Sequence, residues 1–125
     1  MLFRSLATLR EDGAPRVHPV TVTLAHGGLY VFVRAGSRRA GDLRRDARYA
    51  LHAWPHAWND DGWDDEEFEV EGLARRVDDR SRRQEIAGVH NDTAGADDDL
   101  FELLVEAAHW KSRSGGRARV RRWPS

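Results

Sequence analysis

The chain alternates short segments of strand-forming residues with tight turn clusters, and this alternation limits its fold more than any other feature. The segment Val17–Leu24 is rich in β-branched residues, and its valines and threonines alternate between the two faces of a strand. Glu11–Pro15, which contains an Asp-Gly pair, and His26–Gly28 are turn clusters on either side of it. Leu6–Arg10 and Leu29–Val33 have strand length and lie just outside these turns. The pattern predicts three consecutive antiparallel strands in a meander.

Strand-length segments continue to the end of the chain, and two helices interrupt them. A helix is predicted after Ser37, which can cap its first turn, and a second one over Asp79–Val89. Gly72 predicts a bend inside a long strand. No βαβ spacing repeats, so the sequence favours a mainly β fold with short helices, a small antiparallel barrel in a single domain of residues 1–125. About seven strands are expected, over Leu6–Arg10, Val17–Leu24, Leu29–Val33, Tyr49–Trp54, Phe68–Val77, Leu100–Trp110 and Arg117–Trp123.

The composition excludes several kinds of chemistry. The sequence has no cysteine, which rules out disulfides, thiolate nucleophiles, iron–sulfur clusters and cysteine-based zinc sites. Redox chemistry would therefore have to come from a bound cofactor. No apolar segment approaches the ~20 residues that span a bilayer, and the N-terminus does not resemble a secretory leader. We therefore expect a cytoplasmic protein without a membrane partner.

An arginine-rich segment follows the third predicted strand. Between Arg34 and Arg48, six arginines and two aspartates give a local charge of +4, whereas the whole chain has a net charge of −1. A helix N-terminus presents unpaired amide groups and a partial positive charge, and Ser37, Arg38 and Arg39 stand beside it here. The planar guanidinium of arginine can bind two oxygens of a terminal phosphate. These residues predict a phosphate site, and the alternative is a solvated, charged helix face.

The order of several short motifs resembles a known family. The strand Arg16-Val17-His18-Pro19-Val20, a small hairpin, Gly36-Ser37-Arg38-Arg39 and the segment Leu43–Arg48 follow one another, and Glu67–Gly72 comes later. In this order they resemble the pyridoxamine 5'-phosphate oxidase-like family of flavin-binding split barrels. The resemblance covers nearly the whole chain. It implies a split antiparallel β-barrel that forms a homodimer, with one flavin mononucleotide (FMN) in each of two clefts between the subunits.

The resemblance also implies which residues contact the cofactor. In that family one strand lies along the isoalloxazine ring and the ribityl chain, and the next strand flanks the ring. A serine and two basic residues hold the phosphate, and the partner subunit contributes a further strand. No catalytic residue stands out in this chain. The implied cofactor-binding residues are Arg16, Val17, His18, Pro19 and Val20 on the first strand, Phe32 and Val33 on the next, Ser37, Arg38 and Arg39 at the phosphate, and Glu67 from the partner.

The chain differs from the vitamin-processing oxidase of this family at two points. Glu67 stands where that enzyme has a glutamine near the flavin, and the C-terminal segment lacks the Arg-x-His substrate motif. We therefore expect an FMN-binding flavoprotein, an oxidoreductase that transfers hydride or electrons, and we assign it no substrate. The alternatives are a deazaflavin-dependent reductase or a haem-binding protein on the same fold, or a flavin-binding module without turnover.

The histidines and two charged segments raise the question of other ligands. The six histidines form no helical His-x-x-x-His pair, and the eight carboxylates between Asp60 and Glu71 are typical of a solvated surface, so no metal is expected. The segment Lys111–Arg122 carries six positive charges and no acid. Its alternating arginines are typical of a sheet with one wet face, so a nucleic-acid partner is not expected.

Overall fold

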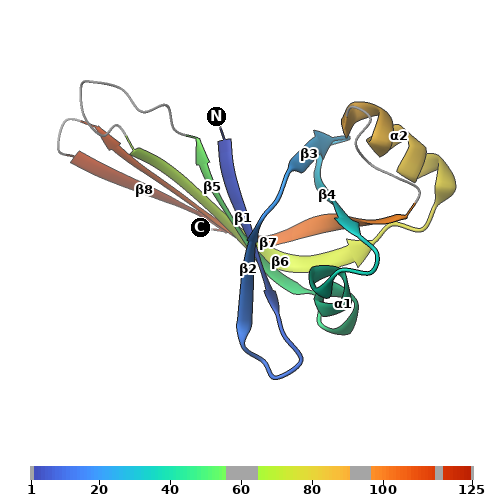
Figure 1. The fold of residues 1–125 in the computed structure, drawn as a ribbon. Coiled ribbons are helices and arrows are strands. Elements are labelled where there is room, and N and C mark those ends of the chain that lie inside the picture. Colours follow the sequence, from blue (N-terminus) through green and yellow to red (C-terminus); the bar gives the residue numbers. More distant parts are fainter. Residues whose placement is uncertain (1, 56–64, 91–96, 115–116, 125) are drawn as a thin grey trace.

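The computed structural model describes residues 2–55, 65–90, 97–114 and 117–124, which form a curled antiparallel sheet with two short helices (Figure 1). The strands pair in the order β2-β1-β5-β6-β7-β4-β3, and β8 pairs with the second half of β7. This is the mainly β split barrel that the sequence predicts. The strands are β1 (Leu2–Leu9), β2 (Pro15–Pro19), β3 (Val22–Ala25), β4 (Gly28–Arg34), β5 (Arg48–Pro55), β6 (Asp65–Arg76), β7 (Asp98–Ser114) and β8 (Arg117–Trp123), and the helices are α1 (Arg38–Arg45) and α2 (Arg80–His90).

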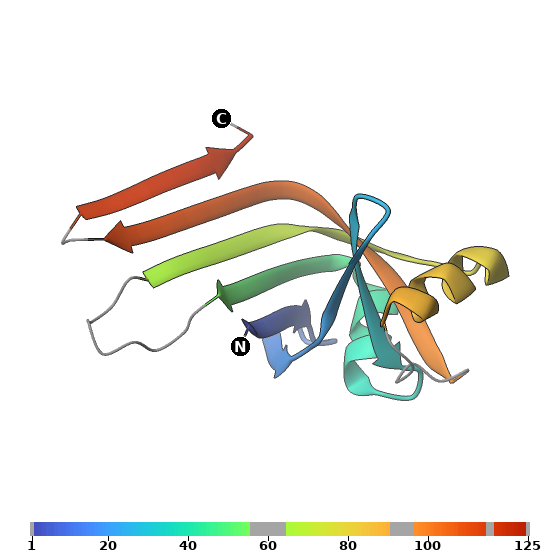
Figure 2. The same ribbon diagram turned by 90° about the horizontal axis from the view of Figure 1, so that it is seen from above.

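The long strand β7 connects the two parts of the sheet. Its residues Asp98 to Leu103 pair with β4, and its residues Ala108 to Ser114 pair with β8. On its other side β6 accompanies it along nearly its whole length. Figure 2 shows β5, β6, β7 and β8 curving side by side. The part of the sheet that carries β8 therefore projects beyond the part that closes around α1, β3 and β4 (Figure 1).

The structure corrects the expected meander. The segment Val17–Leu24 forms two strands, β2 and β3, which pair with β1 and β4 respectively. β2 and β3 are the two edge strands of the curled sheet, so the chain passes from one edge to the other between Pro19 and Val22. The two edges lie close together there, because Arg4 of β1 donates a hydrogen bond to the Val22 carbonyl. Pro19 has no amide hydrogen for a ladder, and the Val20 amide donates to the Arg4 carbonyl at 3.2 Å. Strand propensity predicted the extended backbone but not this change of pairing partner.

Alternate positions of β4 face two different cores. Val31 and Val33 point into the main core of the barrel, whereas Tyr30 and Phe32 belong to a second cluster that includes Ile86 of α2. The period of two is what a strand covered on both faces requires. The buried residues of the main core are Leu6, Val22, Val31, Val33, Ala40, Leu43, Tyr49, Leu51, Val70, Ala74, Phe101 and Leu103.

Gly72 marks an irregularity in the long strand β6, where the sequence predicts a bend. The register between β6 and β7 shifts between Glu71 and Gly72, as in a β-bulge. A Cβ atom at position 72 would lie 1.9 Å from the carbonyl oxygen of Leu104. No larger residue fits here unless the backbone moves, so the close approach of the two strands requires glycine.

Two segments lie between the expected strands and helices, residues 58–65 and 90–99. Both fall mostly outside the described residues, and the end of the second belongs to β7. Within the described ranges, no helix is long and apolar enough to cross a membrane.

Candidate functional site

The N-terminus of α1 carries the residues expected to hold a phosphate. Ser37 is the N-cap: its Oγ accepts a hydrogen bond from the Ala40 amide at 3.2 Å, and the same hydroxyl donates to the Arg34 carbonyl at 2.6 Å. The first turn of the helix has no acidic residue. Its other amide groups and the partial positive charge of the helix end therefore favour an anion at this place.

Two guanidiniums flank this helix end. Arg38 is exposed, and among the described residues its side chain has no hydrogen-bond or ion-pair partner. Arg39 is half-buried, and its Nη1 donates to the Pro19 carbonyl at 3.3 Å. This bond joins the first turn of α1 to the last residue of β2. The structure thus brings Ser37, Arg38 and Arg39 together with β2.

A buried carboxylate also fixes β2 against α1. The side chain of Asp42 is only 3% exposed. Its Oδ2 accepts hydrogen bonds from Thr8 Oγ1 and Arg16 Nε, both at 2.7 Å, and its Oδ1 accepts one from Arg45 at 3.1 Å. Burial by itself would raise the pKa of Asp42, but the bonds from Arg16, Thr8 and Arg45 outweigh it and hold that pKa below its usual range. Asp42 is therefore a buried anion at neutral pH.

The same network holds Arg16, one of the expected cofactor-binding residues. Its guanidinium is mostly buried and forms an ion pair with Asp42. The role that this structure shows for Arg16 is therefore to position β2 against α1. Sequence reasoning missed Asp42. The available signal was an acidic residue between Ala40 and Leu43, two apolar positions of an otherwise polar helix.

His18 lies on β2, beside Pro19. Its Nε2 atom is enclosed and has no hydrogen-bond partner within the part of the chain that the structure describes. Burial and the guanidiniums of Arg39 and Arg16 lower the pKa of His18, although Asp42 acts in the opposite direction. The ring is therefore neutral at pH 7. An enclosed, unpaired nitrogen beside a cationic helix end fits a polar anionic ligand bound there.

A cavity of about 320 Å³ lies against the sheet where β1, β5, β6 and β7 run side by side. Val17 of β2, which is 67% exposed, reaches it from the strand that also carries His18. Its walls are mainly small and apolar, a surface that suits a planar ring. The lining residues are Ser5, Ala7, Val17, Ala50, Leu51, His52, Glu69, Val70, Glu71, Ala107, Ala108 and His109.

The other expected residues are not gathered at the helix end. Val33 is buried in the main core, Phe32 packs on the opposite face of β4, and Val20 packs against the main core. Glu67 lies near the beginning of β6, at the end of the sheet away from α1 (Figure 1). Its Oε1 is 2.8 Å from Nε2 of His52, a residue that the sequence analysis did not select. Within one chain, Glu67 is separate from the cationic helix end.

The family follows from comparison with known proteins. The family model for pyridoxamine 5'-phosphate oxidase matches residues 3–114, which is most of the chain. The chain belongs to the pyridoxamine 5'-phosphate oxidase family. This confirms the resemblance that the strand at residues 16–20 and the motif at the start of α1 indicated. A comparison with curated proteins gave no match.

Several solved structures share the fold of this family member. A haem binding protein from Mycobacterium smegmatis has a TM-score of 0.76 at 20% identity; the match covers 97% of this chain and 51% of that protein, so the chain spans about half of its length. The haem storage protein HutZ from Vibrio cholerae has a TM-score of 0.61 at 18% identity, covering 83% of this chain and 81% of that one. A pyridoxinephosphate oxidase family protein from Clostridium acetobutylicum, related to general stress protein 26, has a TM-score of 0.67 at 11% identity, covering 97% and 85%. At these identities the likeness establishes the fold alone.

Proposed function

We propose that this chain binds FMN between two copies of itself and acts as an oxidoreductase. The observation that carries the proposal is the N-terminus of α1, where a capped helix start without acidic residues meets two arginines and the end of β2. FMN ends in a phosphate, and guanidiniums at a helix N-terminus bind phosphate through paired hydrogen bonds and charge. Membership of the pyridoxamine 5'-phosphate oxidase family supports the same cofactor.

Each part of the site has a task in this proposal. Arg38, Arg39 and the helix end that Ser37 caps would hold the phosphate. Arg16, fixed by Asp42, keeps β2 beside the helix. Val17, whose side chain is on the opposite face of β2 from those of Arg16 and His18, would face the remainder of the cofactor from the cavity. When bound, FMN supplies the hydride or electron transfer, and the protein binds and orients it. Val33 and Phe32 support β4 from its two faces.

A second copy of the chain completes the site. Every residue of β8 is exposed, including Val120 and Trp123, and Val17 of β2 is also exposed beside the cavity. Exposed apolar side chains on a projecting sheet favour association with another protein surface. A second copy that covers this surface would also carry its own Glu67 toward the cationic helix end of the first.

Haem is the second candidate, because two solved structures with this fold are described as haem proteins. The visible spectrum of the purified protein separates the candidates. Bands at about 370 and 450 nm indicate flavin, a band at about 420 nm indicates a deazaflavin, and a sharp Soret band indicates haem. A protein that carries haem, or that fails to take up added FMN, would contradict the flavin proposal.

The phosphate anchor is tested by removing its two arginines. Replacing Arg38 and Arg39 together with alanine should weaken FMN binding, measured by the quenching of flavin fluorescence, by roughly 1.5 to 3 kcal/mol per lost charge-assisted hydrogen bond. The matched control replaces Arg80 and Arg82, which occupy the first turn of α2, and should leave the affinity unchanged. Equal affinities for the two double variants would place the phosphate elsewhere. Sedimentation velocity of the same proteins shows whether FMN-loaded protein is a dimer, and a loaded monomer would contradict the two-copy site.

A further inference from the structure

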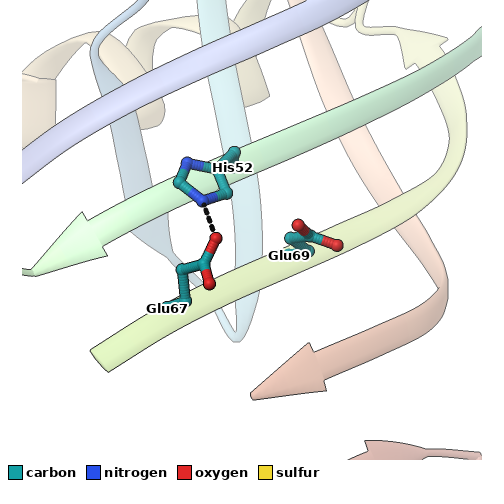
Figure 3. A group of neighbouring side chains, drawn as sticks. All are labelled: His52, Glu67 and Glu69. Atoms are coloured by element: carbon teal, nitrogen blue, oxygen red, sulfur yellow. Dashed lines mark hydrogen bonds and ion pairs between the residues drawn. The ribbon is translucent and has the colours of Figure 1, made fainter. Parts of the chain in front are cut away.

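Three potential metal ligands gather on one face of the ladder between β5 and β6 (Figure 3). His52 of β5 lies directly opposite Glu69 of β6 in the strand register. Glu67 is two residues earlier on β6, so its side chain is on the same face as that of Glu69. One ligand atom from each of the three side chains lies within 4.8 Å of the other two.

We propose that His52, Glu67 and Glu69 bind a divalent transition-metal cation of the Zn²⁺ class. Zinc sites are tetrahedral, with bonds of about 2.0 to 2.2 Å to imidazole nitrogen and carboxylate oxygen, so two ligands of one ion are about 3.3 to 3.6 Å apart. In this structure the three ligand atoms lie within 4.8 Å of one another, and the His52–Glu67 pair is at 2.8 Å. Small rotations of the two glutamate side chains, each of which has three flexible torsions, close the difference.

The charges at this place favour a cation. The His52–Glu67 contact at 2.8 Å uses one atom of each side chain. The Glu69 carboxylate is exposed and has no hydrogen-bond or ion-pair partner among the described residues. Glu71 follows on the same face of the strand, so negative charge accumulates along β6. A metal ion would neutralise two of these carboxylates at once.

The donor set selects among metals. One imidazole nitrogen with two carboxylate oxygens suits zinc and its neighbours in the first transition series, whereas magnesium and calcium prefer oxygen alone. His52 and Glu69 both line the 320 Å³ cavity, so an ion held by them would face open space and keep positions for water or a small ligand. His109, opposite Glu69 on β7, lines the same cavity and is the nearest candidate for a fourth ligand.

The ligands were not apparent from the sequence because they come from two strands. His52 and Glu67 are brought together by the antiparallel register of β5 and β6, and no short spacing motif records that register. The inference does not depend on FMN, because the three side chains meet within a single chain.

The test is a titration of untagged, chelator-treated protein with ZnCl₂ by isothermal calorimetry. We expect one Zn²⁺ per chain with micromolar or tighter affinity, and much weaker binding of Mg²⁺. His52→Ala and Glu69→Gln should each weaken Zn²⁺ by about ten-fold or more, since even outer-shell changes at metal sites cost that much. Glu66→Gln is the matched control: it removes an exposed carboxylate from the same strand but from its opposite face, outside the group, and it should bind Zn²⁺ as the unmodified chain does.

A second measurement uses the unmodified chain, so the test does not depend on the variants folding. Zn²⁺ should shift the ring signals of His52 in a nitrogen-15 correlation spectrum of the histidine side chains, and should leave those of the exposed His26, which pairs with Glu85, in place. Millimolar affinity, affinity unchanged in both His52→Ala and Glu69→Gln, or ring signals of His52 that do not respond would each overturn the proposal.

Discussion

Replacing Asp42 with asparagine tests whether one buried carboxylate holds the cationic helix end in place. The change keeps the size of the side chain but removes its charge and turns one acceptor oxygen into a donor. Thr8, Arg16 and Arg45 would then face a group that cannot accept all three of their hydrogen bonds. Removing one partner of a buried ion pair costs about 3 to 5 kcal/mol, and because Arg16 keeps some solvent contact we expect the lower end, about 3 kcal/mol.

The loss is large compared with the stability of a chain this size, which is about 5 to 15 kcal/mol. Urea denaturation followed by tryptophan fluorescence measures it, because a change in midpoint without a change in slope reports stability alone. Glu85→Gln is the control: the carboxylate of Glu85 is half-exposed and pairs with His26 and Arg82 at the surface. Such exposed pairs contribute about 0 to 1 kcal/mol. A cost below about 1 kcal/mol for Asp42→Asn would refute the assignment of Asp42 as the anchor of β2.

The pH dependence of the same variant gives an independent check. The pKa of Asp42 is held below its usual range in the folded chain, so at low pH the unfolded chain takes up this proton more readily than the folded one. The stabilisation from Asp42 is therefore fully present above the unfolded pKa of about 3.9 and is lost as the pH falls through the folded value. The difference in stability between the original chain and Asp42→Asn should be constant above about pH 5 and shrink below it. A difference that grows toward low pH would contradict this reasoning.

Three further predictions concern the scaffold. Gly72→Ala places a Cβ 1.9 Å from the Leu104 carbonyl oxygen and should cost about 3 kcal/mol or more of unfolding free energy, measured in urea. A Cβ atom at position 41, inside α1, would have no other atom within 4 Å. Gly41→Ala should therefore stabilise the chain by about 0.5 to 1 kcal/mol in the same assay, so that the two glycine substitutions change stability in opposite directions. Burial, with a smaller contribution from Glu106, raises the pKa of Tyr49 to about 12. Ultraviolet titration should therefore show Tyr49 ionising at a higher pH than a tyrosine in the unfolded chain. The stability of the fold should decrease as the pH rises from about 10 toward the pKa of Tyr49.

The local features of the fold were predictable because the physics that sets them is local. Ser37 caps α1 through atoms three residues away, and Gly72 lies where β6 changes register. The division of Val17–Leu24 into β2 and β3 was not predictable in the same way. Both halves have the residues of a strand, and they differ only in the strand with which each one pairs: β2 pairs with β1, and β3 pairs with β4.

In the candidate site, too, local features were predictable from the sequence and contacts between distant residues were not. The position of Arg38 and Arg39 at the start of α1 was predictable because they directly follow the capping residue Ser37. Asp42 and His52 were missed because their partners are distant in the sequence. Asp42 accepts hydrogen bonds from Thr8 and Arg16, and His52 is in hydrogen-bond contact with Glu67. Pairings of this kind depend on strand register and helix docking, and a single sequence does not record either one.

Glu67 connects the two proposals, because the FMN site takes it from a second copy and the metal site takes it from its own chain. If both hold, the two ligands must influence each other. Zn²⁺ bound at Glu67 would remove a negative charge that faces the anionic cofactor, so saturating ZnCl₂ should tighten FMN binding by about five-fold or more. Because binding linkage is reciprocal, FMN should tighten Zn²⁺ by the same factor, and both effects should vanish in Glu67→Gln. If both ligands bind and neither affects the other, Glu67 serves one of the two sites and the assignment to the other is wrong.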